Sequence, residues 1–138
     1  MSTEASVAAN KEALRRAASI FGPERFEEYL KLYAEDARLH FLPPGLPPGR
    51  AGARVFYGAI FDAFENLRLT IDDMVGEGDQ VGLRFSLVGT HRKEFLGVPA
   101  SNREVQVSGV TIFRFANGEC VERWSQSNLL AVLQRAVV

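Results

Sequence analysis

The apolar residues of this chain change their spacing near residue 65. Before that point they recur every three or four positions, as on one face of a helix. Beyond it they alternate with polar residues, as on one face of a strand. This order predicts an α+β fold, with N-terminal helices packed on a curved antiparallel sheet. A sheet that wraps around helices forms a cone-shaped barrel, whose open end leads to a concave, mostly apolar site.

Three helices are predicted in the first half of the chain. The first begins at Asn10, a residue type that caps helices, and ends before Gly22-Pro23. The second follows Pro23, and the third covers residues 51–64. Their apolar faces are Leu14, Ala17, Ala18 and Phe21, then Phe26, Tyr29, Leu30 and Tyr33, then Val55, Phe56, Ile60, Phe61 and Phe64. Residues 1–9 are small and polar and are expected to be flexible, which leaves 10–138 as a single domain.

Strands are predicted at residues 37–42, 67–71, 81–90, 105–115 and 120–128. Between the first two lies a loop, residues 43–49, too rich in proline for a helix or a central strand. Asn117-Gly118 is a strong signal for a hairpin between the last two strands. Residues 129–137 are expected to form a short apolar tail.

Composition excludes several classes of protein. The net charge of −1 gives no electrostatic reason to expect a nucleic acid or an anionic membrane as partner. One cysteine, Cys120, excludes an internal disulfide and a zinc site of several cysteines. Two histidines without spaced carboxylate partners argue against any metal site. Without a secretory signal or an apolar run that could span a bilayer, the expected location is cytoplasmic.

Short motifs occur in a fixed order along almost the whole chain. They are Asn10-Lys11, Leu32-Tyr33-Ala34-Glu35-Asp36 with His40, Gly78-Asp79-Gln80-Val81, Arg84, Gly89-Thr90-His91, Phe95-Leu96-Gly97-Val98-Pro99, Phe113-Arg114-Phe115 with Asn117-Gly118, Glu122-Arg123-Trp124, Leu129-Leu130 and Leu133-Gln134. In this order and spacing the chain resembles the SnoaL-like polyketide cyclases, within the nuclear transport factor 2-like, ketosteroid-isomerase-like superfamily. The resemblance implies the cone-shaped fold, a small-molecule ligand and pairing into a homodimer through the sheets.

The resemblance also draws attention to Asn128. Such cyclases usually carry an acidic residue four positions after the tryptophan, where it serves as general acid or base. In this chain that position holds Asn128. An amide does not exchange protons near neutral pH, so the family mechanism is not carried over intact.

The last predicted strand carries four candidate site residues on one face: Glu122, Trp124, Gln126 and Asn128. If this face turns into the cone, Gln126 and Asn128 could donate hydrogen bonds to a carbonyl or enolate oxygen. Trp124, and Phe56 of the third helix, could line the cavity and stack on a planar ligand. The alternative is that the two amides cap strand ends or face water.

The strand at 81–90 has one apolar face, formed by Val81, Leu83, Phe85 and Leu87, and Arg84 and Ser86 lie on its other, polar face. An arginine on the concave wall could anchor an anionic or carbonyl ligand. In relatives similar to limonene epoxide hydrolase an Arg-x-Asp pair occupies an equivalent strand, and Ser86 stands here in place of the acid. The alternative is an arginine on the outer, solvent-exposed face.

His40 and His91 are the candidates for moving a proton, because imidazole titrates near pH 7. Each ends a predicted strand, where the mouth of the cone would lie. His40 is preferred as the base because it follows the helix pair that would roof the pocket. For both, the alternative is a structural histidine satisfied by the backbone.

Three functions remain open at this point. The first is a cofactor-independent enzyme that moves a proton and stabilises an enolate, in a cyclase, isomerase or lyase step on a carbonyl-bearing or polyketide-like ligand. The second is a non-catalytic module that binds a small ligand or serves in assembly. The third is an epoxide hydrolase or epoxide-opening cyclase, which needs a carboxylate, with Glu122 as the obvious one on that wall.

Overall fold

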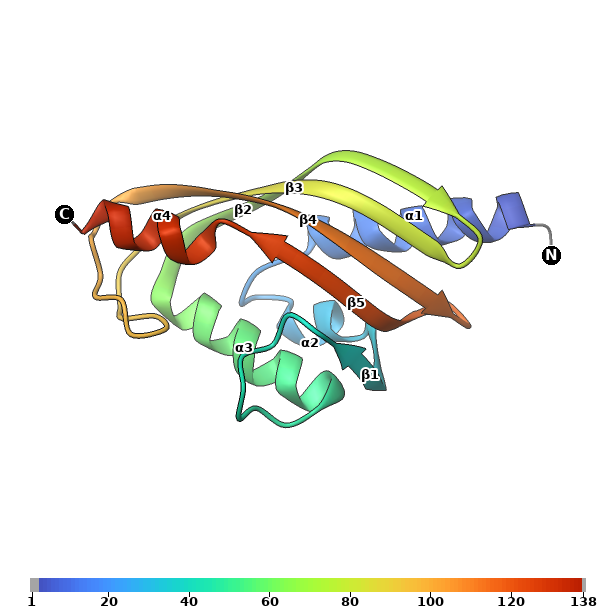
Figure 1. Cartoon of the computed structure of the whole chain (residues 1–138), viewed down its shortest axis with the longest axis horizontal. Coiled ribbons are helices and arrows are strands. Elements are labelled where there is room, and N and C mark those ends of the chain that lie inside the picture. The colour runs from blue at the N-terminus through green and yellow to red at the C-terminus, as the bar shows by residue number, and fades with distance from the viewer. Residues whose placement is uncertain (1–2, 138) are drawn as a thin grey trace.

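The computed structural model describes residues 3–137, with side chains from residue 6 onward. Five strands form one open, curved sheet, and the helices in the first half of the chain pack against its concave side (Figure 1). This confirms the α+β class and the predicted packing of N-terminal helices on a curved sheet. No helix in the described part of the chain is long and apolar enough to cross a membrane.

The sheet has the strand order β1-β5-β4-β3-β2. An antiparallel meander makes up most of it, namely β2 (Phe64–Glu77), β3 (Gln80–His91), β4 (Glu104–Ala116) and β5 (Glu119–Ser127). At one edge β1 (Tyr33–Leu39) pairs in parallel with β5. Asn117 and Gly118, between β4 and β5, have positive φ angles of 52° and 81°, as the predicted two-residue hairpin turn requires.

The helices are α1 (Thr3–Ser19), α2 (Phe26–Leu30), α3 (Gly49–Ala63) and α4 (Leu129–Ala136). α1 packs along β2 and β3, and α3 packs on β1 and the start of β2. α3 begins at Gly49, where φ is 71° and a Cβ atom would collide with the carbonyl oxygen of Glu35. Glycine is therefore required where the proline-rich loop turns into the helix.

Three boundaries differ from those predicted. α1 begins at Thr3 rather than Asn10, so the described part of residues 1–9 is helical, while its flexibility stays a prediction and residues 1–2 lie outside the described chain. Tyr33 is not on a helix but begins β1, because it pairs with Cys120 of β5. The residues predicted as a tail form α4, whose Leu133 is fully buried.

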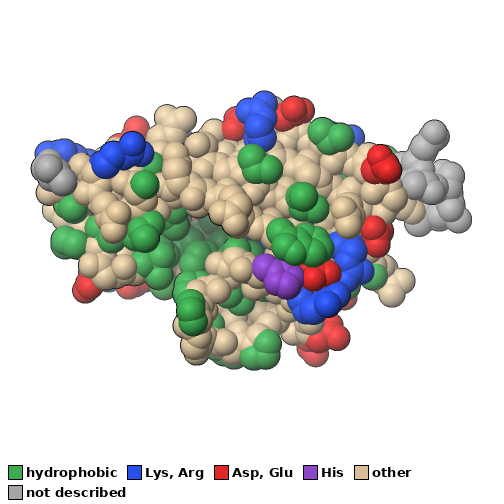
Figure 2. All heavy atoms as spheres, viewed as in Figure 1, with side chains coloured by type: hydrophobic (Ala, Val, Ile, Leu, Met, Phe, Trp, Pro, Cys, Tyr) green, Lys and Arg blue, Asp and Glu red, His purple; other side chains and the backbone are tan. Residues whose placement is uncertain are grey.

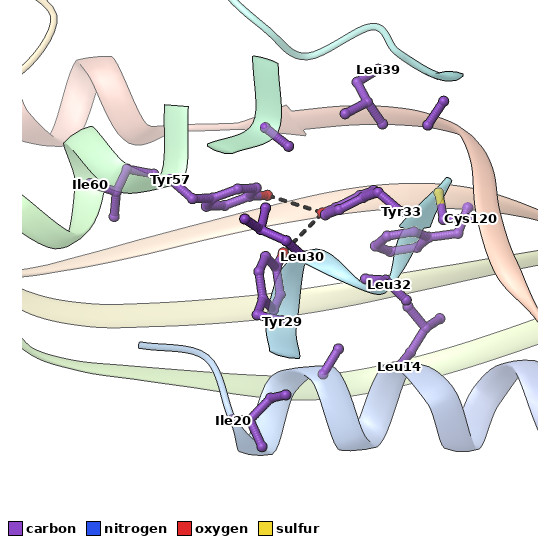
Figure 3. Packing of buried hydrophobic residues seen from close by; sticks show 14 of the residues in the cluster. Leu14, Ile20, Tyr29, Leu30, Leu32, Tyr33, Leu39, Tyr57, Ile60 and Cys120 are labelled. Atoms are coloured by element: carbon purple, nitrogen blue, oxygen red, sulfur yellow. Dashed lines mark hydrogen bonds between the residues drawn. The ribbon is translucent and has the colours of Figure 1, made fainter. Parts of the chain in front are cut away.

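The core fills the space between the helices and the concave face of the sheet. Figure 3 shows Leu14 of α1 and Ile20, the residue just after this helix, on the side of Leu30 and Tyr33, which are almost fully buried. Three tyrosines from α2, β1 and α3 meet inside this core, joined through their hydroxyl groups (Figure 3). A core made this way is not wholly apolar, and its polar centre lies at one end of a cavity.

Candidate functional site

A cavity of about 310 Å³ lies between the helices and the concave face of the sheet, and Figure 2 shows a hollow in the surface with hydrophobic walls. Aliphatic side chains of β2 and β3 form one wall: Leu67, Leu69, Ile71, Leu83 and Leu87. Leu96 and Leu130, both about half exposed, line the cavity from a loop and from α4 and mark its mouth. The volume is at the small end of the range of roughly 300–1,000 Å³ typical of small-molecule sites.

The inward face of β5 is the reverse of the one expected. Arg123, Ser125 and Ser127 line the cavity, whereas Glu122 and Trp124 lie on the outer face of the sheet. The period of two was predicted correctly, and the side of the sheet was not. The four candidates on β5 therefore do not form a wall of the cavity.

A β-bulge at Val121 causes this reversal. Phe115 pairs with Cys120, but the next pair is Arg114 with Glu122, so Val121 is an extra residue in β5. If β5 continued without a bulge in the register set by the hairpin turn, Val121 would pair with Arg114, and Glu122 would stand opposite Phe113, whose side chain faces the cavity. With the bulge, Arg123 takes that place. One inserted residue moves every later side chain of the strand to the other face.

Arg123 is the polar centre of the cavity. Its Nη1 donates to the hydroxyl oxygens of Tyr33 (2.6 Å) and Tyr57 (2.7 Å), and its Nε donates to Thr111 Oγ1 (2.9 Å). The Tyr33 hydroxyl is joined in turn to that of Tyr29 at 2.9 Å (Figure 3). The site thus combines a guanidinium with hydroxyl groups at one end of a mostly apolar space.

The guanidinium of Arg123 is held between two aromatic rings. Its Cζ lies 4.5 Å from the ring centre of Phe41 and 4.6 Å from that of Phe113. Such contacts stabilise a cation that has lost its water. Burial lowers the pKa of Arg123, the neighbouring phenols raise it, and the net direction is upward, so the side chain is cationic at any pH at which the fold persists.

Phe56 of α3 lines the cavity, as expected from the sequence. Gln126 and Asn128 do not, since both are exposed on the other side of the sheet. Asn128 is tied to β4: its Oδ1 accepts a hydrogen bond from the Ser108 backbone nitrogen (2.9 Å), and its own backbone nitrogen donates to the Ser108 oxygen (3.1 Å). This matches the alternative in which the amide secures a strand end.

Arg84 and Ser86 also lie on the outer face. Arg84 is exposed, and its Nη2 is 3.8 Å from the carboxylate of Asp73. Ser86 donates a 2.6 Å hydrogen bond to Asp72. Leu83, Phe85 and Leu87 between them face the cavity. Arg84 and Ser86 were expected on the concave wall, and this expectation is wrong. Both lie on the outer face, which was the alternative stated for Arg84.

Three predicted residues, His40, Glu122 and Trp124, do come together, but on the outside of the sheet. His40 Nε2 lies 2.7 Å from Glu122 Oε2, and the imidazole stacks on the indole of Trp124 with ring centres 5.4 Å apart. Figure 2 shows acidic, basic and histidine side chains gathered on the face that carries the hollow. The group is a charged clamp between β1 and β5 rather than part of the cavity lining.

Arginines complete this clamp. Glu122 Oε1 accepts hydrogen bonds from Arg38 and Arg114, each with an Nη2 distance of 3.0 Å. The hydrogen bond from His40 is the main cause that lowers the pKa of Glu122, and the arginines act in the same direction. Glu122 is therefore ionised near neutral pH and fully engaged with its neighbours.

His91 is completely buried at the end of β3 and stacks on Phe64 with ring centres 4.8 Å apart. Neither of its ring nitrogens has a hydrogen-bond partner among the described residues. His91 does not line the cavity, whereas the ring of Phe64 that stacks on it does. The alternative was a structural histidine whose ring is hydrogen-bonded to the backbone. His91 does not match this either, because only its main-chain nitrogen and oxygen form hydrogen bonds.

The remaining titratable groups offer no metal site in the described part of the chain, where no three His, Cys, Asp or Glu residues gather. Cys120 is buried, and its Sγ donates to the carbonyl oxygen of Glu122 at 3.4 Å. Burial raises the pKa of this thiol to about 11. A thiol in this state is a packing residue rather than a nucleophile.

Sequence reasoning missed Arg123, Tyr57 and Thr111, which are the polar residues at the deep end of the cavity. Arg123 was seen only as the middle residue of the Glu122-Arg123-Trp124 motif. A signal was present in the strand before it, because Phe113 and Phe115 mark the inward face of β4. Only the bulge decides which residue of β5 stands opposite them.

Comparisons with known proteins agree with this geometry. Residues 11–136 match the family described as SnoaL-like polyketide cyclase. No curated protein sequence matches the chain.

Several solved structures share the fold. TsrD from Streptomyces laurentii is 28% identical with a TM-score of 0.78, and the match covers 99% of this chain and 98% of that one. IdmH from Streptomyces antibioticus is also 28% identical with a TM-score of 0.78, covering 94% and 99%. A SnoaL-like protein of Jannaschia sp. CCS1 is 26% identical with a TM-score of 0.82, covering 95% and 93%. These proteins have the same open, curved sheet with helices on its concave side.

Proposed function

This chain belongs to the SnoaL-like polyketide cyclase family, and from that premise we propose that its cavity is the active site of a cofactor-independent cyclase-type enzyme. The ligand would carry carbonyl groups on a mostly apolar body, which suits an apolar lining with hydrogen-bond donors at one end. Arg123 and Tyr57, both at the cavity surface, would hold the oxygen on which negative charge develops.

One observation carries this proposal: a buried guanidinium with preset donors at the end of an apolar cavity. Donors fixed in place before the reaction stabilise an enolate better than water does, because they need no reorganisation. The two aromatic rings and the three hydrogen bonds fix the orientation of Arg123. Phenols are neutral near pH 7 and can donate a hydrogen bond or a proton to the same oxygen.

The reaction proposed is an internal aldol addition, which loses no atoms. A carbon between two carbonyl groups gives its proton to water, and the enolate oxygen rests on Arg123 and Tyr57. The enolate carbon forms a bond to a second carbonyl carbon of the same molecule, and that carbonyl oxygen takes up a proton from water. The product is an isomer of the ligand, so no oxidant, reductant or cofactor is consumed.

Proton exchange tests the first step directly. The probe is 1-phenylbutane-1,3-dione in deuterated buffer, with NMR following the loss of its central methylene protons. We expect exchange about tenfold or more above the buffer rate with the wild-type protein, and near the buffer rate with Arg123→Met. Arg68→Met is the matched control, because Arg68 is exposed and pairs only with Glu104 on the outside of the sheet.

A second candidate function is supported by the lining itself. Among the described residues that line the cavity, none carries a carboxylate or an imidazole. This favours a non-catalytic module that binds the same kind of ligand. The exchange experiment separates the two, since a binding module would hold the diketone without accelerating exchange. The epoxide-opening alternative loses its support, because the carboxylate of Glu122 lies outside the cavity.

We also propose that two copies of the chain pair through the outer face of the sheet. Trp124, Ile112 and Val75 are 38%, 41% and 69% exposed, and they form one row across the strands with Gly82 between the last two. A row of large apolar side chains on a soluble surface is a common mark of a self-complementary interface.

Light scattering after size exclusion tests the pairing. Ile112→Lys is expected to convert a dimer into a monomer, because a lysine in the middle of the row would be buried without a partner. Val55→Lys is the control, since Val55 is 48% exposed on α3, away from the sheet. A wild-type protein that is monomeric at all concentrations would refute the interface.

A further inference from the structure

Arg123 has no counter-ion among the residues that the structure describes. The residue is 8% exposed, and its hydrogen-bond partners in the described chain are hydroxyl groups. Burial raises the pKa of Tyr33 well above its ordinary value, so this phenol stays neutral. The adjacent carboxylate, Glu122, lies on the opposite face of β5 and is bonded to Arg38, Arg114 and His40. Buried charges in proteins are normally paired, and an unpaired one is costly.

One nitrogen of the guanidinium is unused. Nε donates to Thr111, and Nη1 donates to Tyr33 and Tyr57, whereas Nη2 donates to none of the described residues. Only the ring nitrogens of His91 are both enclosed and unpartnered in this part of the chain, so Nη2 is not sealed inside protein. Since Arg123 lines the cavity, its free donor is open to whatever fills that space.

The rest of the cavity limits what can bring an acceptor to this donor. Ser125 and Ser127 follow Arg123 on the same face of β5, about 7 Å and 14 Å away along the strand. The facing wall, from β2 and β3, is apolar, with aliphatic side chains and the rings of Phe64 and Phe85. A ligand that fits both walls has an acceptor at its inner end, an apolar body, and polar substituents along one edge at most.

We infer that the cavity selects ligands that carry a negative charge, as a carboxylate or an ionised enol or phenol, and that this charge pairs with Arg123 at the inner end. The inference rests on the proposed function in taking this cavity as the ligand site, and it adds the charge of the ligand. The anion is the counter-ion of Arg123. Ser125 and Ser127 on one side and the apolar wall of β2 and β3 on the other position the remainder of the molecule.

Isothermal titration with a matched pair of probes tests the inference. The probes are naphthalene-2-carboxylate and its neutral methyl ester, which share the apolar body and differ in charge. We expect the wild-type protein to bind the carboxylate about 10- to 100-fold more tightly than the ester. Arg123→Met should lose that preference, and Arg68→Met, the exposed control described above, should keep it.

A second measurement needs only the wild-type protein, in case Arg123→Met does not fold. With arginine labelled by ¹⁵N, the side-chain signals of one buried arginine should shift on titration with the carboxylate and stay in place with the ester. Equal affinity for the two probes, no binding of the carboxylate, or no such shift would overturn the inference.

The two proposals can fail separately. Acceleration of diketone exchange without any preference for the carboxylate would refute the charge selection and leave the cyclase-type reaction standing. Preference for the carboxylate without acceleration would keep the charge selection and favour a binding module.

Discussion

The hydroxyl oxygen of Tyr33 lies 2.6 Å from Nη1 of Arg123, and that nitrogen is shared with the hydroxyl of Tyr57 at 2.7 Å. Tyr33 is fully buried and does not line the cavity, whereas Tyr57 does. The two phenols thus make equivalent hydrogen bonds to the same cation, but only one of them can also contact a ligand. Stability and ligand binding can therefore be separated at this pair.

Replacing either phenol leaves a buried guanidinium donor with one acceptor fewer. Tyr33→Phe and Tyr57→Phe should each lower the free energy of unfolding by about 1–3 kcal/mol in urea denaturation. Tyr57→Phe alone should also weaken binding of naphthalene-2-carboxylate. Tyr29→Phe is the control, because its hydroxyl meets other phenols and not the cation. Equal loss of ligand affinity in Tyr33→Phe would contradict the assignment of the cavity wall.

The bulge at Val121 decides which side chain enters the cavity, because it adds one residue between the hairpin turn and Glu122. Deleting Val121 removes this unpaired residue and leaves Glu122 opposite Arg114 and Arg123 opposite Phe113. We therefore expect the deletion variant to keep a cooperative thermal transition by circular dichroism, at a cost of about 1–3 kcal/mol in stability. Val121→Ala keeps the residue count and should cost only about 1 kcal/mol. A deletion variant without a cooperative transition would mean that the bulge itself is needed, and not only the pairing beyond it.

The clamp around Glu122 predicts a dependence of stability on acid. His40 above all, then Arg114 and Arg38, hold the pKa of Glu122 below its ordinary value, and burial acts the other way. A lowered folded-state pKa stabilises the protein at pH values above the ordinary glutamate pKa of about 4.3, and this contribution disappears as the pH falls through the lowered value. The stability difference between wild type and Glu122→Gln should therefore shrink as the pH falls below about 5.

Urea denaturation at a series of pH values measures this difference. Glu12→Gln serves as the control, since Glu12 is exposed on α1 and pairs only with Arg15 one turn away. A difference for Glu122→Gln that stays constant down to the acid limit of the fold would show that the clamp does not bind the ionised form more tightly.

Cys120 should act as a reporter of unfolding. Its thiol is inaccessible, and burial raises its pKa to about 11, so the reactive thiolate is scarce. We expect a thiol-reactive dye to label the native protein only as fast as the core opens, and to label it at once in concentrated urea. Labelling of the native protein at the rate of a free thiol would show that β1 does not cover β5 in solution.

The fold could be read from local spacing because each element repeats its own period. β3 is the clearest case: alternation alone assigned Leu83, Phe85 and Leu87 to one face, and they line the cavity. The spacing of Phe26, Tyr29, Leu30 and Tyr33 was misleading, since a short helix and the start of a strand happen to continue one helical stripe. Pairing with β5, which lies far away in sequence, overrides that local pattern at Tyr33.

The site was harder to predict because it depends on phase and on pairing rather than on period. The unpaired Val121 reverses which side chains of β5 point into the cavity, and no residue type in this segment predicts such a bulge. The contact of His40 with Glu122 follows from the parallel pairing of β1 with β5, across 82 positions of sequence. His40 and Glu122 were correctly singled out as chemically active groups, but their meeting place on the outer face needed the whole sheet.

The parallel pairing of β1 with β5 also sets the order in which the protein can be finished during synthesis. β1 leaves the ribosome early, but the strand it pairs with in the described sheet, β5, is the last of the five to be made. Until β5 is made, the edge of β1 stays unpaired, and Tyr33 and Tyr57 lack their hydrogen bonds to Arg123. Contacts between such distant segments slow folding. The sheet of this domain is therefore complete only after β5 has been translated, and until then the exposed edge of β1 must be kept from pairing with another strand.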